Sequence, residues 1–307
     1  MSAIDPEVRK AYRKMPKRLV TGPILMKLSR RFDKMLMPKT SMDGLVSEDI
    51  PTPGTTKTIR IHRRSDSTGA VPVVFWIHGG GYIAGNNTTE DRWGALFCRS
   101  FDCAVVAAGY RLAPENPFPA GLDDLRAAVQ WILDHGADQG LDPGRILIAG
   151  ESGGGGLAAA LTQRLHDEGV LVAGQLLACP MLDDRTAVRT DIGRREHILW
   201  TNGSNHFGWS SYLGTEPGGE TVPEYAVPAR RSDLAGLPPT WIGVGDLDLF
   251  WDENLEYGRR LEEAGVPVTL ETAEGGPHGY QTMAPEAAIS KRFNASAAAF
   301  AKEMLGG

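Results

Sequence analysis

The stretch Ile146-Leu147-Ile148-Ala149-Gly150-Glu151-Ser152-Gly153-Gly154 decides the fold of this 307-residue chain. Its four leading apolar residues predict a buried strand, and the residues that follow, up to Leu165, predict a helix. Between them lies the pattern Gly-x-Ser-x-Gly, in which Gly150 and Gly154 permit a sharp turn around Ser152. Because the helix N-terminus behind the serine favours negative charge, we interpret Ser152 as a nucleophile. The alternative, a phosphate-binding glycine loop, lacks both the Lys-Ser/Thr pair and a complete Gly-x-Gly-x-x-Gly with its acid.

Predicted strands and helices alternate on both sides of this stretch. The predicted strands are Thr58–His62, Val73–Ile77, Cys103–Ala108, Leu176–Ala178, Trp241–Val244 and Val268–Leu270, and the further helices are Asp123–Leu133, Glu253–Glu263 and Glu286–Met304. This alternation predicts an α/β fold, in which helices cover both faces of a mostly parallel sheet. Right-handed crossovers then bring the carboxyl ends of the strands to one edge, where we expect the functional site.

The composition excludes several classes of protein. Apolar residues make up 42% and charged residues 23% of the chain, which is typical of a globular protein and not of a disordered or coiled-coil one. The net charge of −6 argues against a nucleic-acid partner. Three cysteines without metal-ligand spacing suit a reducing compartment. The start of the chain lacks a signal-peptide core and the apolar run Val71–Ile77 is too short to span a membrane, so we expect a cytoplasmic protein without stable membrane insertion.

The first 40 residues are strongly basic. They hold eleven Lys/Arg and three Asp/Glu, a local charge of +8 that leaves −14 for the rest of the chain. Their apolar residues at helical spacing are Leu25, Leu28, Phe32, Met35 and Leu36. We expect a helix that packs this stripe on the main body, with an amphipathic membrane contact as the alternative.

A second segment, Asp183–Pro239, interrupts the alternation of strands and helices. A structureless loop of this length is unusual inside a domain, so we expect an insertion with helices of its own. Together with the N-terminal segment it can form a cap over the site. The predicted division of the chain is 1–45 and 183–215 for the two parts of the cap, and 46–182 and 216–307 for the catalytic domain.

A glycine-rich segment, His78-Gly79-Gly80-Gly81-Tyr82, follows the predicted strand that ends at Ile77. Acyl transfer places negative charge on a carbonyl oxygen and therefore needs N–H groups directed at it. Glycines allow the backbone to approach a substrate closely. We predict that Gly80, Gly81 and Gly153 donate these hydrogen bonds, and that His78 braces the loop. A merely flexible turn is the alternative.

A serine nucleophile also needs an imidazole base and an acid that orients it. Three acids, Asp246, Asp248 and Asp252, follow the predicted strand Trp241–Val244, and His278 lies beyond the last predicted strand in a glycine-rich segment. We predict that His278 is the base. The remaining candidates, which lie on predicted strands, on helices or in the insertion, are His62, His135, His166, His197 and His206.

These motifs together resemble the bacterial hormone-sensitive-lipase-like esterases, a branch of the α/β-hydrolases. The matching pieces, spread over about residues 57–305, are His78–Gly81, Tyr110–Glu115, Phe118–Ala120, the turn around Ser152, Asp248–Glu253 and His278–Gly279. The resemblance implies an α/β-hydrolase fold whose helical cap comes from the N-terminus and from an insertion after the sixth strand. It also implies hydrolysis of short-chain acyl and aryl esters without cofactor or metal, and it assigns the acid to Asp248.

The sequence departs from the family at two points. The turn reads Gly-Glu-Ser-Gly-Gly, where the family more often has Asp before the serine and Ala after it. The acid segment begins Asp246-Leu247-Asp248, where the family usually has Asp-Pro-Leu, so Asp246 stays the second candidate for the acid.

The sequence therefore predicts a serine carboxylesterase that acts on a small-molecule ester through an acyl-enzyme. The predicted pocket walls are aromatic: Tyr82, Trp200, Phe207 and Trp209. Aromatic residues of this kind more often form a small core of the cap than contact substrate, which is the alternative. An amidase, formamidase or peptidase on the same fold is the first alternative, and a non-catalytic ligand receptor is the second. Similar proteins also allow a homodimer, which no pattern in this sequence specifies.

Overall fold

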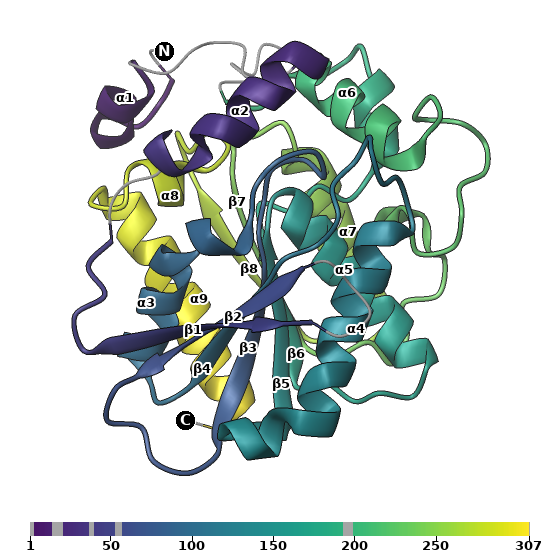
Figure 1. The fold of residues 1–307 in the computed structure, drawn as a ribbon. Helices are drawn as coiled ribbons and strands as arrows, with labels where there is room; N and C mark the ends of the chain where they lie inside the picture. The colour runs from purple at the N-terminus through teal and green to yellow at the C-terminus, as the bar shows by residue number, and fades with distance from the viewer. Residues whose placement is uncertain (1–2, 14–20, 37–39, 53–56, 193–198, 307) are drawn as a thin grey trace.

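The fold is built on one eight-stranded sheet (Figure 1). The computed structural model describes residues 3–13, 21–36, 40–52, 57–192 and 199–306, without the side chains of 32–36. The strands are β1 Leu45–Pro51, β2 Thr58–Arg64, β3 Val71–Ile77, β4 Ala104–Ala108, β5 Leu141–Glu151, β6 Gly174–Ala178, β7 Thr240–Gly245 and β8 Val268–Ala273. Their order across the sheet is β1-β2-β4-β3-β5-β6-β7-β8.

Strand β5, which ends at the Gly-x-Ser-x-Gly turn, lies in the middle of the sheet. It pairs in parallel with β3 on one side, where Ile148 lies opposite Phe75, and with β6 on the other. Strands β4, β3, β5, β6, β7 and β8 are parallel, whereas β1 and β2 run antiparallel at one edge. The predicted mostly parallel sheet is confirmed. The sequence analysis missed β1, because most of its residues are exposed and it has no continuous apolar run.

Helices cover both faces of the sheet, as predicted. They are α1 Pro6–Tyr12, α2 Pro23–Leu36, α3 Asp91–Ser100, α4 Ala120–His135, α5 Gly153–Asp167, α6 Asn202–Leu213, α7 Trp251–Glu263, α8 Tyr280–Met283 and α9 Ala288–Leu305. Alternate residues of β3 point to opposite faces: Phe75 packs with residues of α4, α5 and α7, and Trp76 packs with residues of α3 and α9. Because both faces are covered, every residue of β3 is buried.

The remaining helices α1, α2 and α6 gather at the end of the sheet toward which the parallel strands run (Figure 1). This end carries the site described below. The prediction that the N-terminal segment and the insertion divide the chain at residues 45, 182 and 215 stays a prediction.

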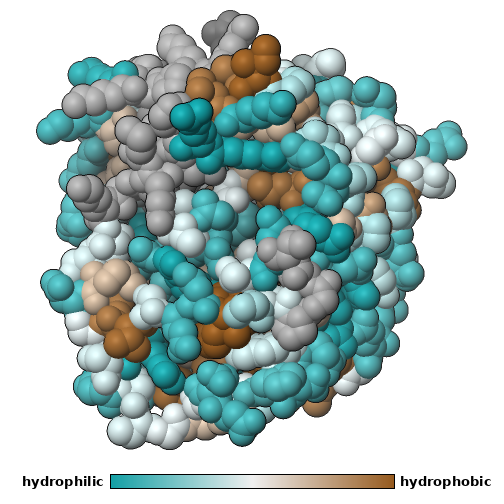
Figure 2. Space-filling view, viewed as in Figure 1, coloured by the Kyte–Doolittle hydropathy of each residue, from teal (hydrophilic) through white to brown (hydrophobic). Residues whose placement is uncertain are grey.

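Helix α2 presents a different side to the body than predicted. Leu25 and Leu28 are 38% and 51% exposed, and with Ile24 they form apolar surface on α2 (Figure 2). The side that packs inward carries buried Met26 and Arg30, whose guanidinium donates to the carbonyl oxygens of Ile83 and Ala113. The prediction for Leu25 and Leu28 was therefore wrong, because hydrogen bonds from Arg30 orient the helix. The other predicted stripe residues, Phe32, Met35 and Leu36, have side chains outside the described part.

The central strand makes a prediction about stability. Ile148 is fully buried on β5, whereas Leu270 on β8 is 45% exposed. We expect Ile148→Ala to lower the free energy of unfolding by about 2–5 kcal/mol, because it removes buried methyl groups and leaves a cavity. The control Leu270→Ala should cost less than about 1 kcal/mol. Urea unfolding followed by tryptophan fluorescence measures both values, and equal costs would contradict this view of the core.

Candidate active site

Ser152 lies on a strained turn between β5 and α5. Its φ of 58° and ψ of −123° are unusual for a residue with a side chain. The turn requires glycine on both sides, since a methyl group on Gly150 would lie 2.3 Å from the carbonyl oxygen of Gly154. A methyl group on Gly154 would lie 2.2 Å from the carbonyl oxygen of Ile77. The backbone N–H of Ser152 donates to the carbonyl of Ala178 over 2.8 Å, which fixes the turn against β6.

Three side chains from different loops meet at this turn. The distance from Ser152 Oγ to His278 Nε2 is 2.9 Å, and the distance from His278 Nδ1 to Asp248 Oδ2 is 2.8 Å. Ser152 follows β5, Asp248 follows β7, and His278 follows β8. All three side chains are buried. The sheet thus brings together three residues that lie up to 126 positions apart in the sequence. They are the three residues that the sequence analysis selected.

The other two acids of the segment have different partners. Asp246 Oδ1 accepts a hydrogen bond from the N–H of Gly275 over 2.7 Å, and Asp252 forms an ion pair with Arg189 at 3.1 Å. Asp248 also accepts from the N–H of Phe250 over 3.0 Å, which holds its carboxylate toward the imidazole. Asp248 is therefore the acid in contact with His278.

The environment of His278 raises its pKa. Burial is the strongest influence and by itself lowers the pKa, since it disfavours the charged ring. The negative charge of Asp248, the interaction with Cys179 and the hydrogen bond to Asp248 together outweigh burial and hold the pKa of His278 well above its ordinary value near 6.5. Because only the neutral ring accepts a proton, the imidazole becomes a base at higher pH than an isolated histidine does.

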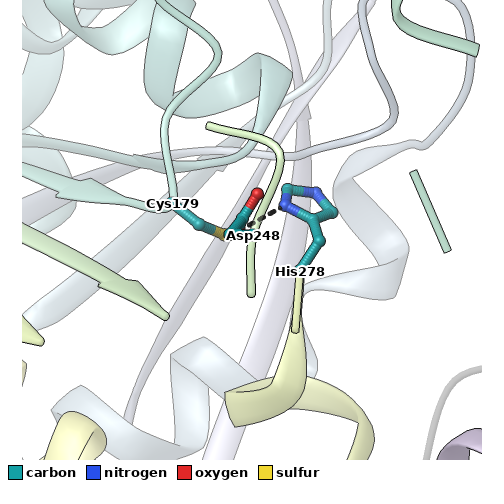
Figure 3. A group of neighbouring side chains, drawn as sticks. All are labelled: Cys179, Asp248 and His278. Atoms are coloured by element: carbon teal, nitrogen blue, oxygen red, sulfur yellow. Dashed lines mark hydrogen bonds and ion pairs between the residues drawn. The ribbon is translucent and has the colours of Figure 1, made fainter. Parts of the chain in front are cut away.

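Cys179 lies beside the Asp248–His278 pair (Figure 3). In the described part of the chain, these three residues form the one group of potential metal ligands whose donor atoms all lie within 4.8 Å of one another. Burial raises the pKa of the Cys179 thiol, so it stays protonated at neutral pH. A metal ion would have to displace that proton and the hydrogen bond between Asp248 and His278. The predicted absence of a metal stays a prediction.

The glycine-rich loop after β3 packs closely against the turn at Ser152. Gly80 and Gly81 have φ values of 112° and 57°, and a methyl group on Gly81 would lie 2.0 Å from the indole of Trp200. A methyl group on Gly153 would lie 2.9 Å from the backbone nitrogen of Gly81, so the two glycines are in close contact. A glycine at position 153, where the family more often has alanine, thus lets the two backbone segments pack closely. Among hydrogen bonds between described residues, none uses the N–H of Gly80, Gly81 or Gly153.

His78 belongs to the glycine loop itself. Its Nδ1 lies 2.9 Å from the carbonyl oxygen of Gly79, and its ring stacks on Tyr110 at 4.2 Å between centroids. Burial lowers the pKa of His78 to about 4, so the ring is neutral in this position. None of the other histidines that the structure describes lines the cavity at Ser152: His62, His135, His166 and His206. His197 lies outside the described residues.

A cavity of about 190 Å³ opens onto Ser152 and His278. The remaining described residues that line it are Ser29, Gly79, Gly80, Gly81, Ala84, Gly85, Thr89, Glu90, Glu151, Leu199, Trp200, Gly279, Thr282 and Met283. Of the four aromatic residues predicted as pocket walls, Trp200 is among them and Tyr82, Phe207 and Trp209 are not.

The three other aromatics are packed into the core instead. The Tyr82 hydroxyl donates to the carbonyl of Met181 over 2.8 Å, and its ring stacks on Tyr212 at 4.2 Å. Trp209 meets Tyr82 edge-on at 5.1 Å, and Phe207 is half-buried against the same apolar cluster. These three residues therefore pack in the apolar core, as the alternative in the sequence analysis has it, and are not among the described residues that line the cavity.

Sequence reasoning missed three residues that contact the site. Glu90 and Glu151 line the cavity, and Tyr12 of α1 donates from its hydroxyl to the carbonyl of His278 over 2.6 Å. Glu151 directly precedes Ser152 in the Gly-x-Ser-x-Gly pattern, so its place beside the cavity could have been predicted from the sequence. Tyr12 and Glu90 carry no local signal, because only the tertiary fold brings them near Ser152.

Comparisons with known proteins identify the family. A profile described as "alpha/beta hydrolase fold" matches residues 74–282. The chain belongs to this family. It is 37% identical to the esterase LipI of Mycobacterium tuberculosis over 211 residues, which cover 68% of this chain and 65% of LipI. It is 29% identical to an ethyl acetate hydrolase of Pseudomonas putida over 239 residues, which cover 75% of this chain and 73% of that enzyme.

A solved structure of a bacterial heroin esterase has a TM-score of 0.91 and 35% identity, with 99% of this chain and 98% of that one covered. The predicted fold and the resemblance to hormone-sensitive-lipase-like esterases are thereby confirmed. The names of these relatives agree with the predicted class, a carboxylic ester hydrolase. The aligned region spans slightly less than two thirds of LipI.

The contact between Asp248 and His278 predicts a titration. We expect His278 to titrate above 6.5, because the carboxylate stabilises the imidazolium. In Asp248→Asn the charge is lost and burial alone should lower the pKa below that value. In the control Asp246→Asn, which leaves the pair intact, the pKa should stay raised. NMR of labelled histidine, with His278 assigned by its loss in His278→Gln, measures all three, and equal shifts in both aspartate variants would exclude Asp248 as the partner.

Proposed function

We propose that the protein is a serine carboxylesterase that hydrolyses short-chain acyl and aryl esters through an acyl-enzyme. One observation carries this proposal: Ser152 Oγ lies 2.9 Å from His278 Nε2, while His278 Nδ1 lies 2.8 Å from Asp248. A hydroxyl in hydrogen-bond reach of a base, which a carboxylate orients in turn, is the arrangement of serine hydrolases.

In the first step, His278 Nε2 accepts the hydroxyl proton of Ser152 while Oγ forms a bond to the ester carbonyl carbon. The carbonyl π electrons move to its oxygen. When this tetrahedral intermediate collapses, the bond to the alcohol oxygen breaks and the imidazolium returns its proton to the leaving alcohol. Asp248 keeps Nδ1 protonated and stabilises the imidazolium, and the acyl group remains on Ser152.

In the second step, a water molecule gives its proton to His278 and attacks the acyl carbon. The carboxylic acid leaves and the proton returns to Ser152 Oγ. The negative oxygen of both intermediates needs N–H donors. We assign these to Gly80, Gly81 and Gly153, which is supported by the close contact of Gly81 and Gly153 beside the nucleophile.

The preference for small esters is supported by two observations. The cavity at Ser152 has a volume of about 190 Å³, which suits a small substrate. A relative is named for the hydrolysis of ethyl acetate.

A cytoplasmic location is supported by three cysteines that are buried and free. A homodimer is carried over from the resemblance alone, and the acidic composition argues against a nucleic-acid partner.

The described helices include none that is both long enough and apolar enough to cross a bilayer.

Two alternatives remain for experiment. An amidase or peptidase would cleave p-nitroanilides at rates comparable to those for p-nitrophenyl esters, whereas we expect the esters to be preferred. A ligand receptor would leave Ser152 unreactive, whereas an organophosphate should label an activated serine covalently.

The nucleophile makes the most direct prediction. Ser152→Ala should lower the turnover of p-nitrophenyl acetate by about 10⁴-fold or more, because no other hydroxyl replaces the attacking oxygen. The variant should remain folded by circular dichroism and should not gain the mass of an organophosphate adduct. Ser100→Ala, at an exposed serine on α3, serves as the control and should keep full activity and labelling. Substantial turnover by Ser152→Ala would reject the assignment.

The cavity volume makes a second prediction. Across p-nitrophenyl esters from acetate to dodecanoate, kcat/KM should be highest for acyl chains of two to four carbons. It should be at least about tenfold lower for the octanoate, since the longer chain exceeds the cavity of about 190 Å³ at Ser152. A rising series would show that the acyl chain extends elsewhere.

A further inference from the structure

The catalytic cavity holds two carboxyl groups that the mechanism does not use. Glu90 lies just before α3 and is 6% exposed, and Glu151 directly precedes Ser152. Both line the cavity with Ser152 and His278. No lysine or arginine is present among the described lining residues. Among the described residues that line the cavity, the charged side chains apart from His278 are therefore acidic.

Glu90 is held in place by neutral donors. Its Oε2 accepts from the indole N–H of Trp76 over 2.5 Å, and its Oε1 accepts from the hydroxyl of Thr89 over 3.0 Å. Burial, followed by the charge of Glu151, raises the pKa of Glu90 to about 8. At pH 7 the carboxyl is mostly protonated, so a cation that enters the cavity would favour the loss of its proton.

Glu151 is also oriented by neutral groups. Its Oε1 accepts from Gln281 Nε2 and from the Thr282 hydroxyl, each over 2.7 Å, and its Oε2 accepts from Trp93 Nε1 over 3.3 Å. These donors fix the carboxylate at the cavity wall without neutralising it.

Arg92 of α3 is a cation whose charge acts on Glu90. Its guanidinium donates to the carbonyl of Gln281 and to Asn294 Oδ1 at 3.1 Å. Within the described residues it forms no ion pair with Glu90 or Glu151. Its charge attracts both carboxyl groups, whose oxygens accept hydrogen bonds from neutral donors at the cavity wall.

We propose that this cavity selects esters that carry an alkylammonium group, which Glu90 and Glu151 bind while the ester carbonyl lies at Ser152. The inference rests on the proposed function and adds a substrate class to it. The ester carbonyl binds beside Ser152 in this cavity. The two acids bind the positively charged group of the substrate. Trp200 lines the same cavity, and indole rings attract ammonium groups. An ester with a carboxylate in the same position is disfavoured.

The proposal has a pH signature of its own. Since a bound cation favours ionised Glu90, the preference for a cationic ester rises as the pH passes through about 8. The charged groups that face Glu90 are Glu151 at the end of β5 and Arg92 on α3. His278 also titrates, but it acts on every ester, so its effect cancels in a ratio of two substrates.

The test compares acetylcholine with 3,3-dimethylbutyl acetate, which has the same shape but carbon in place of the charged nitrogen. The ratio of their kcat/KM values is measured from pH 6 to pH 9 at constant ionic strength. We expect a ratio above one that increases about tenfold over this range, as one added charge–charge contact predicts. A ratio at or below one, or one independent of pH, overturns the inference. Failure to hydrolyse the neutral ester contradicts the proposed function instead.

A variant distinguishes the effect of Glu90 from the effect of the protein's overall negative charge. Glu90→Gln keeps one oxygen that can accept from Trp76 and places an amide N–H beside the Thr89 hydroxyl, which can accept from it. The charge is removed, so the ratio at pH 9 should fall about tenfold and lose its pH dependence. The control Glu262→Gln removes an exposed charge on α7, outside the cavity, and should leave the ratio unchanged. Equal ratios in both variants overturn the role of Glu90. If Glu90→Gln does not fold, the pH series of the unaltered protein still decides.

Discussion

The geometry of this site depends on the backbone conformation of Ser152. A φ of 58° at a residue with a side chain is strained and persists only where the surroundings enforce it. Here β5 is buried on both faces and α5 begins one residue later, and the missing side chains of Gly150 and Gly154 let backbone approach backbone. The packed sheet thus stabilises a turn that lifts one hydroxyl out of the strand plane.

The same sheet assembles the rest of the machinery. Asp248 and His278 stand on loops after β7 and β8, whose parallel order puts their carboxyl ends beside that of β5. The loops are tied to one another by the hydrogen bond from Gly275 to Asp246. The N-terminal helix α1 contributes through Tyr12, which bonds to the backbone of His278. Positioning therefore extends well beyond the side chains that touch the substrate.

The electrostatic environment of Ser152 divides into two regions. On one side, Asp248 keeps His278 oriented and raises its pKa. On the other side, burial and the charge of Glu151 also raise the pKa of Glu90. For a carboxyl group this favours the neutral form, whereas for His278 a raised pKa favours the charged form. One cavity can hold both groups because each carboxyl group accepts hydrogen bonds from donors of its own within the protein.

Local patterns were sufficient for the central part of the fold. Continuous apolar runs predicted β3, β4 and β5, and small residues around Ser152 marked the turn, because burial and steric limits act within a few residues. The exposed strand β1 and the helix α3 left no comparable pattern. The face of α2, the choice of Asp248 over Asp246, and the placement of Trp200 rather than Tyr82 at the cavity were decided by contacts between distant segments. Such contacts depend on how elements pack in three dimensions, and neither periodicity nor spacing along the chain records that packing.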